Sequence, residues 1–266
     1  MKLIAEIGWN HMGDINLAKD MIDKASESGS DIVKFQTWSV SRLKNGPWDS
    51  DGRREIYIKA ELSKEDHQEL KIHADEKKVR FASSVFSIED AKLLKEISND
   101  LVKIPSFECR NKELIKYALD NFSEVIVSTG TANSQELDLL ASYLPANKST
   151  LMHCVSSYPC FAENANLPRI NYIKNIFESV GYSDHVRGID VAVASLEYEP
   201  KYIEKHFTTN NDLPGRDNKF AILPKEMKSL VDFSNLREKL KKNLGVDYQL
   251  CENESRNLYD GRFNAK

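Results

Sequence analysis

The spacing of apolar residues along the chain alternates about eight times between two patterns. Short apolar runs, such as residues 3–8, are each followed by a longer segment in which apolar residues recur every three or four positions, as in residues 15–29. The short run is typical of a buried strand, and the longer spacing is typical of an amphipathic helix. Eight strand–helix pairs in succession predict an α/β protein that folds as a (β/α)8 barrel, also called a TIM barrel.

These runs place the individual elements. Predicted strands cover residues 3–8, 31–37, 80–86, 101–106, 124–130, 150–156, 180–183 and 202–207. Predicted helices cover residues 15–29, the segment capped by Ser63, and residues 88–97, 111–121, 134–143 (capped by Ser134), 170–177, 189–196 and 224–242. Residues 39–59 predict a long polar loop. We expect residues 1–243 to form a single barrel domain and residues 244–266 to form a C-terminal arm or a truncated linker.

Length and composition fit one barrel. The chain has 266 residues, near the roughly 250 of a typical barrel, and 41% of them are hydrophobic, enough to fill a large core. The net charge of −4 argues against a nucleic-acid-binding protein. Because no apolar run is as long as a membrane span and the first residues enter a strand at once, we expect no membrane segment, no signal peptide and a cytoplasmic location. The four cysteines lack Cys-x-x-Cys spacing and predict buried or incidental thiols rather than disulfides.

Polar side chains gather where the predicted strands end, and in a barrel the loops after the strands build the active site. Lys34 and Lys103 have apolar neighbours within their strands, where a lysine is costly unless an anion pairs with it. Each could form an ion pair with Glu6 or Glu108. The whole set of polar groups favours instead a pocket for phosphate and carboxylate. The set is Glu6, Lys34, Gln36, Ser83, Ser84, Lys103, Ser106, Glu108, Ser128, Thr129, His153, Ser156, Tyr158, Ser183, Asp184, His185, Lys205 and His206.

Two histidines stand at the ends of neighbouring strands. His185 and His206 are 21 residues apart, which is the spacing of one strand–helix unit. Imidazoles at adjacent strand ends, with Asp184 beside one of them, favour a divalent metal site over two structural histidines. A site with few protein ligands leaves positions open for substrate or water. The spacing does not choose among Mn²⁺, Mg²⁺, Zn²⁺ and Fe²⁺.

Seven motifs occur in order along the chain. They are Ala5-Glu-Ile-Gly-Trp-Asn-His-Met-Gly13, Val33-Lys-Phe-Gln36, Val102-Lys-Ile-Pro-Ser106, Val127-Ser-Thr-Gly130, His153-Cys-Val-Ser-Ser-Tyr-Pro159, Gly181-Tyr-Ser-Asp-His185 and Glu204-Lys-His-Phe-Thr208. Together they resemble the sialic acid synthase family, which comprises N-acetylneuraminate synthases and their legionaminate and pseudaminate relatives. The resemblance covers residues 3–226.

The resemblance implies an enzyme that condenses phosphoenolpyruvate with the aldehyde of an N-acyl amino sugar, giving a nonulosonic-type 2-keto-3-deoxy acid and phosphate. It implies Glu6 as the acid/base group and His185 and His206 as ligands of the metal, with Mn²⁺ or Mg²⁺ favoured over Zn²⁺, Co²⁺ or Fe²⁺. The substrates would be bound by Lys34, Gln36, Ser84, Lys103, Ser106, Glu108, Ser128, Ser156, Tyr158, Ser183 and Asp217, with Gln36, Tyr158 and Asp217 on the sugar side.

The sugar side also departs from the family pattern. A small antifreeze-protein-like C-terminal domain of the family, which lends an arginine to the sugar site, has no counterpart before residue 266, and the usual Gly-Pro-Asp-His-x-x-Ser reads Gly215-Arg-Asp-Asn-Lys-Phe-Ala221. Arg216, Arg262 or the pair Arg53-Arg54 could replace that arginine. We therefore expect a changed acceptor, and either a homo-oligomer or a separately encoded partner domain.

Two other classes remain open. Metal-dependent hydrolase barrels commonly carry His-x-His at the end of the first strand, whereas this chain has Asn10-His11. A barrel that only binds a sugar or a protein partner would not need Glu6, both lysines and both histidines together.

Overall fold

The computed structural model describes residues 1–263 and confirms the predicted barrel. Eight parallel strands pair in chain order, and the last pairs with the first, so the sheet is closed. The strands are β1 (Lys2–Gly8), β2 (Ile32–Thr37), β3 (Arg80–Val85), β4 (Leu101–Ile104), β5 (Glu124–Ser128), β6 (Ser149–His153), β7 (Val180–Asp184) and β8 (Tyr202–His206).

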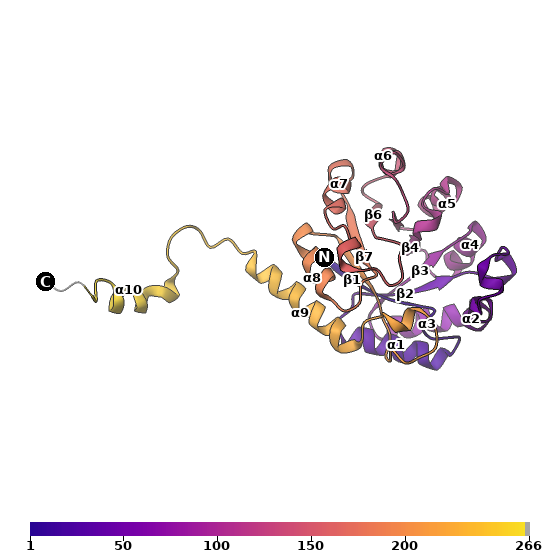
Figure 1. Ribbon diagram of the computed structural model, residues 1–266, viewed down its shortest axis with the longest axis horizontal. Coiled ribbons are helices and arrows are strands. Elements are labelled where there is room, and N and C mark those ends of the chain that lie inside the picture. The colour runs from indigo at the N-terminus through magenta and orange to yellow at the C-terminus, as the bar shows by residue number, and fades with distance from the viewer. Residues whose placement is uncertain (264–266) are drawn as a thin grey trace. The chain divides into compact units, whose positions relative to one another are not determined.

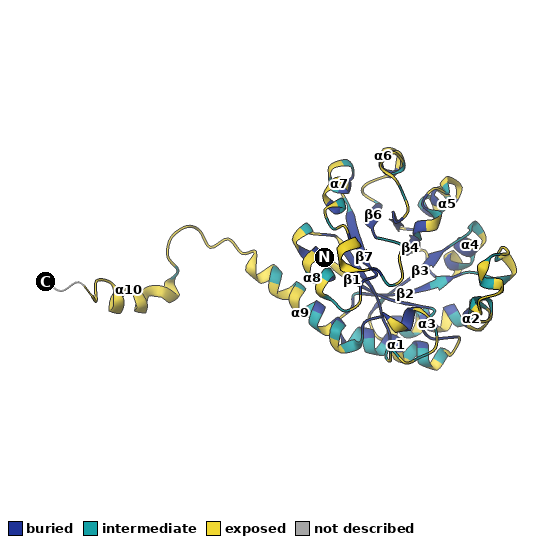
Figure 2. Ribbon diagram, viewed as in Figure 1, coloured by how far each residue is buried: buried dark blue, intermediate teal, exposed yellow. Residues whose placement is uncertain are grey.

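Within the first unit, helices follow the strands and lie around them (Figure 1). The helices of the described chain are α1 (Ile15–Glu27), α2 (Arg53–Ala60), α3 (Lys64–Glu76), α4 (Ile88–Ile97), α5 (Lys112–Asn121), α6 (Ser134–Tyr143), α7 (Arg169–Ile176), α8 (Asp190–Ser195), α9 (Pro224–Leu240) and α10 (Asn253–Tyr259). The chain divides into two compact units, residues 1–234 and residues 235–266. The first unit holds the whole barrel, and Figure 2 shows its strands buried beneath partly exposed helices.

Alternation along the strands separates two apolar layers. Outward-facing residues pack beneath the helices in one large core that includes Val33, Phe35 and Ile203. Inward-facing residues form a smaller apolar layer across the barrel interior, consisting of Ile4, Ile32, Ala82, Leu101, Ile126, Met152 and Tyr202. This inner layer is a packed plug rather than a pore. Two residues further along each strand, the next inward-facing side chains lie at the mouth of the barrel, where the carboxyl ends of the strands are.

A charged network lies at the opposite, amino-terminal end of the strands. Arg80 donates to Asp100 at 2.6 and 2.8 Å and to Glu124 at 2.9 Å. Glu124 also accepts hydrogen bonds from Lys201 and from the Tyr202 hydroxyl, both at 2.6 Å. Groups at this end of a barrel contribute to stability rather than to catalysis.

Two local predictions were wrong. Residues 39–59 do not form a plain loop, because they contain α2 and two short 3₁₀ segments. The helix α2 has almost no apolar periodicity and buries only Ala60, so the pattern could not reveal it. Asn133, rather than Ser134, caps α6 through a bond from the Glu136 N–H at 2.9 Å.

Residues 244–266 were expected to form a C-terminal arm or a truncated linker. The described part of this segment contains α10 and the 3₁₀ segment Leu250–Glu252. Apolar side chains of this segment are exposed, including Leu250 and Phe263. The last three residues of the expected arm, 264–266, lie outside the described residues.

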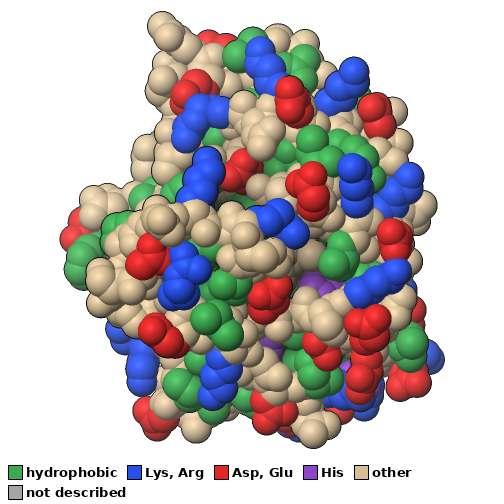
Figure 3. Space-filling model, turned by 90° about the vertical axis from the view of Figure 1, so that its right-hand side faces the viewer, with side chains coloured by type: hydrophobic (Ala, Val, Ile, Leu, Met, Phe, Trp, Pro, Cys, Tyr) green, Lys and Arg blue, Asp and Glu red, His purple; other side chains and the backbone are tan. Residues whose placement is uncertain are grey.

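The cysteines, the length of the helices and the surface charges were also the subject of predictions. All four cysteines are free, and Cys251 is the exposed one. Within residues 1–263, no helix has both the length and the apolar character needed to cross a membrane. Acidic and basic side chains are interspersed over the face shown in Figure 3, in keeping with the small net charge.

Candidate active site at the carboxyl ends of the strands

Four buried charged side chains meet above the inner apolar layer. The Lys34 Nζ atom lies 2.5 Å from Glu6 Oε2 and 3.7 Å from Glu204 Oε2. The Lys103 Nζ atom lies 2.6 Å from Glu204 Oε1. The strand register explains this grouping, because Glu6 pairs with Lys34 on β2 and with His206 on β8. Two ammonium groups and two carboxyl groups thus lie together and are almost inaccessible to solvent.

The two carboxyl groups differ in their affinity for protons. Burial raises the pKa of Glu6, against the opposing influence of Lys34. Burial also disfavours the charge on Glu204, but Lys103 and Lys34 overcome that effect and lower its pKa. Glu204 therefore stays ionised while Glu6 readily holds a proton. Carboxyl groups whose pKa values are pushed apart in this way are suited to separate acid and base roles.

Glu204 is the residue that sequence reasoning missed. The alternative of a Lys103–Glu108 ion pair was wrong, because the described contact of Glu108 is a hydrogen bond from Asn111 Nδ2 at 3.0 Å. Lys103 pairs instead with Glu204, which is 101 positions away. Period-two alternation could have revealed it, since Glu204 precedes the predicted ligand His206 by two residues and shares its face.

Hydroxyl groups surround the charged cluster. Lys34 donates to Ser84 Oγ at 2.8 Å, and Ser183 Oγ donates to Glu204 at 3.1 Å. The Gln36 amide donates to Glu6 Oε1 at 2.9 Å. All three predicted residues therefore contact the cluster directly.

A second group of small side chains forms a cradle around Gly130. A Cβ atom added there would lie 2.8 Å from Ser106 Oγ and 2.8 Å from Cys154 Sγ, and closer still to Ser156 Oγ. The hydroxyls of Ser156 and Ser128 are buried without a hydrogen-bond partner. Unpaired buried donors are costly. The cradle thus offers free donors to an anionic ligand, and an oxygen-rich group such as phosphate fits it.

The two histidines face each other at the mouth, with ring centroids 5.5 Å apart. His185 Nδ1 donates to the Val155 carbonyl at 2.7 Å, so its Nε2 keeps a lone pair. Burial lowers the pKa of His185 to about 4, and burial together with the neighbouring His185 lowers that of His206 well below its usual value. Both imidazoles are therefore neutral at physiological pH, as metal ligands must be.

These residues fit a divalent metal with open positions. The buried Nδ1 of His206 has no hydrogen-bond partner, and Asp217 Oδ2 lies 3.5 Å from it. Within residues 1–263, no three histidine, cysteine or acidic side chains are grouped closely enough to form a protein-only metal cage. Two neutral imidazoles would thus share the metal with substrate or water rather than enclose it.

Aromatic rings line one side of the mouth. Tyr158 lies 4.3 Å from the His185 ring, and Phe220 lies 4.9 Å from the His206 ring, centroid to centroid. Trp9 donates to Asp217 Oδ2 at 2.5 Å and stacks on Tyr57 of α2 at 5.0 Å. Burial raises the pKa of Asp217 to about 6. The unpredicted helix α2 therefore contributes to this wall.

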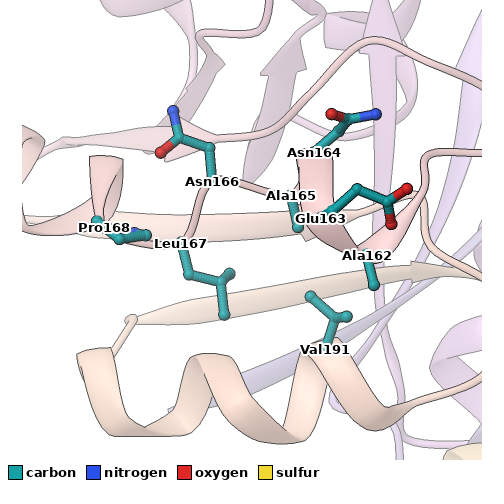
Figure 4. Close-up of a pocket in the computed structure, with 8 residues that line it drawn as sticks. All are labelled: Ala162, Glu163, Asn164, Ala165, Asn166, Leu167, Pro168 and Val191. Carbon is teal, nitrogen blue, oxygen red and sulfur yellow. The ribbon is translucent and has the colours of Figure 1, made fainter.

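An open cavity of about 610 Å³ lies elsewhere on the first unit (Figure 4). It is lined by residues 162–168 and by Val191, and none of the strand-end residues described above lines it. Its walls carry one charged side chain, Glu163. The buried charged side chains and the two facing histidines therefore lie at the barrel mouth rather than in this cavity.

A closed barrel with paired lysines and carboxyl groups and two neutral histidines at its carboxyl ends belongs to the (β/α)8 enzymes. Residues 21–245 match the model of the NeuB family. The chain is 36% identical over 245 residues to N,N'-diacetyllegionaminic acid synthase of Campylobacter jejuni, which covers 86% of this chain and 73% of that protein. It is 34% identical over 246 residues to pseudaminic acid synthase of Helicobacter pylori, covering 87% and 72% respectively.

A solved structure agrees. The N-acetylneuraminic acid synthetase of Leptospira borgpetersenii, in complex with citrate, superposes with a TM-score of 0.83 at 32% identity, covering 97% of this chain and 92% of that one. The chain belongs to the NeuB family. The predicted resemblance and the prediction of an N-acetylneuraminate synthase-like enzyme are thereby confirmed. The roles of individual residues, the metal, the domain limits at residues 243 and 244, and any oligomer or partner domain stay predictions.

Proposed function

We propose that this enzyme condenses phosphoenolpyruvate with the open-chain aldehyde of an N-acyl amino sugar, and that water completes the reaction to give a 2-keto-3-deoxy acid and phosphate. The observation that carries the proposal is the buried group of Lys34, Lys103, Glu6 and Glu204 beside two neutral histidines. The names of the relatives support the product class, since they are synthases of legionaminic, pseudaminic and N-acetylneuraminic acids.

The lysines and the serine cradle would hold phosphoenolpyruvate. Its carboxylate and phosphate carry negative charge that the two buried ammonium groups can neutralise, and the free hydroxyls of Ser128 and Ser156 can donate to phosphate oxygens. Ser84, Ser106 and Ser183 complete this side. Glu204, ionised between the lysines, holds them in position when no substrate is present.

Glu6 would act as the general acid and then as the general base. When C3 of phosphoenolpyruvate attacks the aldehyde carbon, the aldehyde oxygen gains negative charge and needs a proton. Because burial raises the pKa of Glu6, it can carry that proton and release it at this step. The ionised Glu6 can then take a proton from the water that adds to the electron-poor C2. The new C2 hydroxyl becomes the keto oxygen as the C2–O bond to phosphate breaks, and the hydroxyl proton leaves with phosphate.

A divalent metal bound by His185 and His206 would supply Lewis acidity toward the carbonyl oxygen of the acceptor. Mn²⁺ and Mg²⁺ are the favoured ions, because phosphate and carbonyl oxygens suit them. Tyr158 and Asp217 lie beside these histidines and would face the sugar. Gln36 would reach the same side through its bond to Glu6.

The acceptor differs from N-acetylmannosamine in this proposal. The Asn218 side chain bonds to the loops after β1 and β8. Its amide donates to Asn10 O at 3.1 Å and to Pro214 O at 2.7 Å, and its Oδ1 accepts from the Thr208 hydroxyl. Phe220 and Ala221 are buried and offer no polar group. Fewer free donors on this wall relax or redirect sugar choice, since such sites discriminate mainly through hydrogen bonds.

The test is phosphate release from phosphoenolpyruvate with a panel of aldoses and N-acyl hexosamines, with and without Mn²⁺. We expect release that requires both a sugar and the metal, with poor use of N-acetylmannosamine. Release without any sugar would favour a phosphatase. Efficient turnover of N-acetylmannosamine would refute the altered acceptor while leaving the reaction class intact.

A further inference from the structure

We infer that the buried ion pair between Asp184 and Lys205 positions the two histidines from the outer face of the sheet, so that its removal weakens divalent-cation binding although it touches no ligand atom. The inference rests on the proposed function, because it concerns the histidine pair of that site. It adds two positioning residues that lie outside the barrel interior.

The location of the pair is the first observation. Asp184 and Lys205 face each other in the β7–β8 register, with Nζ 3.0 Å from Oδ2. Each directly precedes one of the histidines in the chain. Because side chains alternate along a strand, the ion pair points toward the helices while His185 and His206 point into the mouth. The two side chains are only 0% and 2% exposed, which excludes a solvated surface bridge.

The second observation is the set of hydrogen bonds that the pair makes with its neighbours. Asp184 Oδ1 accepts from the Val186 N–H at 3.0 Å and from the Tyr182 hydroxyl at 3.1 Å. Lys205 donates to the Val186 carbonyl as well as to Asp184. Val186 directly follows His185. Its backbone N–H and its carbonyl are therefore both hydrogen-bonded to this one ion pair.

The fixed backbone then orients the imidazole. The His185 carbonyl accepts from the Cys160 N–H at 3.0 Å, and its Nδ1 donates to Val155. These bonds join the loop after β6 to the loop after β7. A shift of the backbone at Val186 would break the alignment of His185, and ligand orientation by such outer groups is known to change metal affinity about 10- to 100-fold.

Stability alone does not explain the pair. Taking both charges out of water is expensive, and replacing a buried ion pair by apolar groups of similar volume is often neutral or stabilising. Removing one partner, in contrast, leaves an uncompensated buried charge. A stabilising role and a positioning role therefore give different results when both partners are replaced together.

The experiment uses the full chain and measures Mn²⁺ affinity from the electron paramagnetic resonance signal of free Mn²⁺, beside thermal unfolding. The variants are Asp184→Asn, Lys205→Met and the double variant. The control is Glu124→Gln, which disrupts an ion-pair network at the other end of the barrel. We expect Mn²⁺ binding at least tenfold weaker in both single variants and in the double variant, with the double variant more stable than the single ones. The control should lose stability and keep the wild-type dissociation constant within twofold.

The outcomes distinguish a failure of the inference about Asp184 and Lys205 from a failure of the proposed metal site. A well-folded double variant with the wild-type Mn²⁺ dissociation constant would show that the pair is only structural and would overturn the inference, even if a single variant failed to fold. A wild-type chain that binds no Mn²⁺, or binds it as well after His206→Asn, would overturn the proposed metal site and the inference with it.

Discussion

Glu204 provides the sharpest test of the charged cluster, because its carboxylate lies between the two buried lysines. Its side chain is 3% exposed and accepts from Lys103 at 2.6 Å and from Ser183 at 3.1 Å. Glu204→Gln keeps the shape and removes the charge. Lys34 retains Glu6 at 2.5 Å, but Lys103 is left without a carboxylate partner.

The expected cost follows from that loss. Breaking a buried ion pair destabilises a protein by about 3–5 kcal/mol. Because Lys34 keeps one partner and glutamine can still accept a hydrogen bond, we expect the lower figure of about 3 kcal/mol. For a chain of this size each kcal/mol lowers Tm by about 2–4 °C, which gives a fall of about 6–12 °C.

Inorganic phosphate should reverse much of this loss, because the freed lysine becomes an anion site. A ligand at one hundred times its Kd stabilises the folded state by about 2.7 kcal/mol. The assay is thermal unfolding of wild type and Glu204→Gln in a phosphate series at constant ionic strength. Phosphate also strengthens apolar burial in general, so Glu124→Gln serves as the matched control. A larger phosphate-dependent rise of Tm in Glu204→Gln than in the control supports the anion site, and equal rises in both would refute it.

Three further results are expected. Gly130→Ala should weaken phosphoenolpyruvate binding at least tenfold by calorimetry, since the added methyl group fills the cradle between Ser106 and Cys154, and unchanged affinity would place the phosphate elsewhere. Burial lowers the pKa of His153 to about 4, so the stability it contributes above pH 6.5 is lost as the pH falls toward 4. His153→Gln should therefore show a smaller drop in Tm between pH 7 and pH 5, and an identical drop would contradict a neutral buried imidazole. His206→Asn should abolish turnover yet keep the rise in Tm caused by phosphoenolpyruvate without metal, and loss of that rise would mean that the anion site depends on His206.

The sequence predicted the parts of this molecule that repeat locally. Each barrel strand has an apolar alternation of its own, so all eight strands were placed within a few residues of their observed limits. The lysines, serines and histidines at the strand ends could be identified because polar residues interrupt that alternation. Helix α2 could not be found in this way, since it buries only Ala60 and has no apolar stripe, although its Tyr57 stacks on Trp9.

The partners of the site residues depend on register and closure, which no local pattern contains. Ion pairs of the two lysines with Glu6 or Glu108 were the alternative to an anion pocket, and Lys34 does contact Glu6. Glu108 accepts instead from Asn111. The actual partner of Lys103, Glu204, comes from β8 on another part of the closed barrel. Its role emerges only when the strands are paired in space.

The most direct test of the central claim follows the carbon atom that would form the new bond. Phosphoenolpyruvate labelled with ¹³C at C3 is incubated with the full chain, Mn²⁺ and the best aldose of the panel, and the products are observed by ¹³C NMR. Condensation predicts that the vinyl signal is replaced by an sp³ methylene signal coupled to a new carbon neighbour, at a rate that depends on the aldose. A methyl signal of pyruvate, formed at the same rate with or without aldose, would contradict the proposed carbon–carbon bond formation.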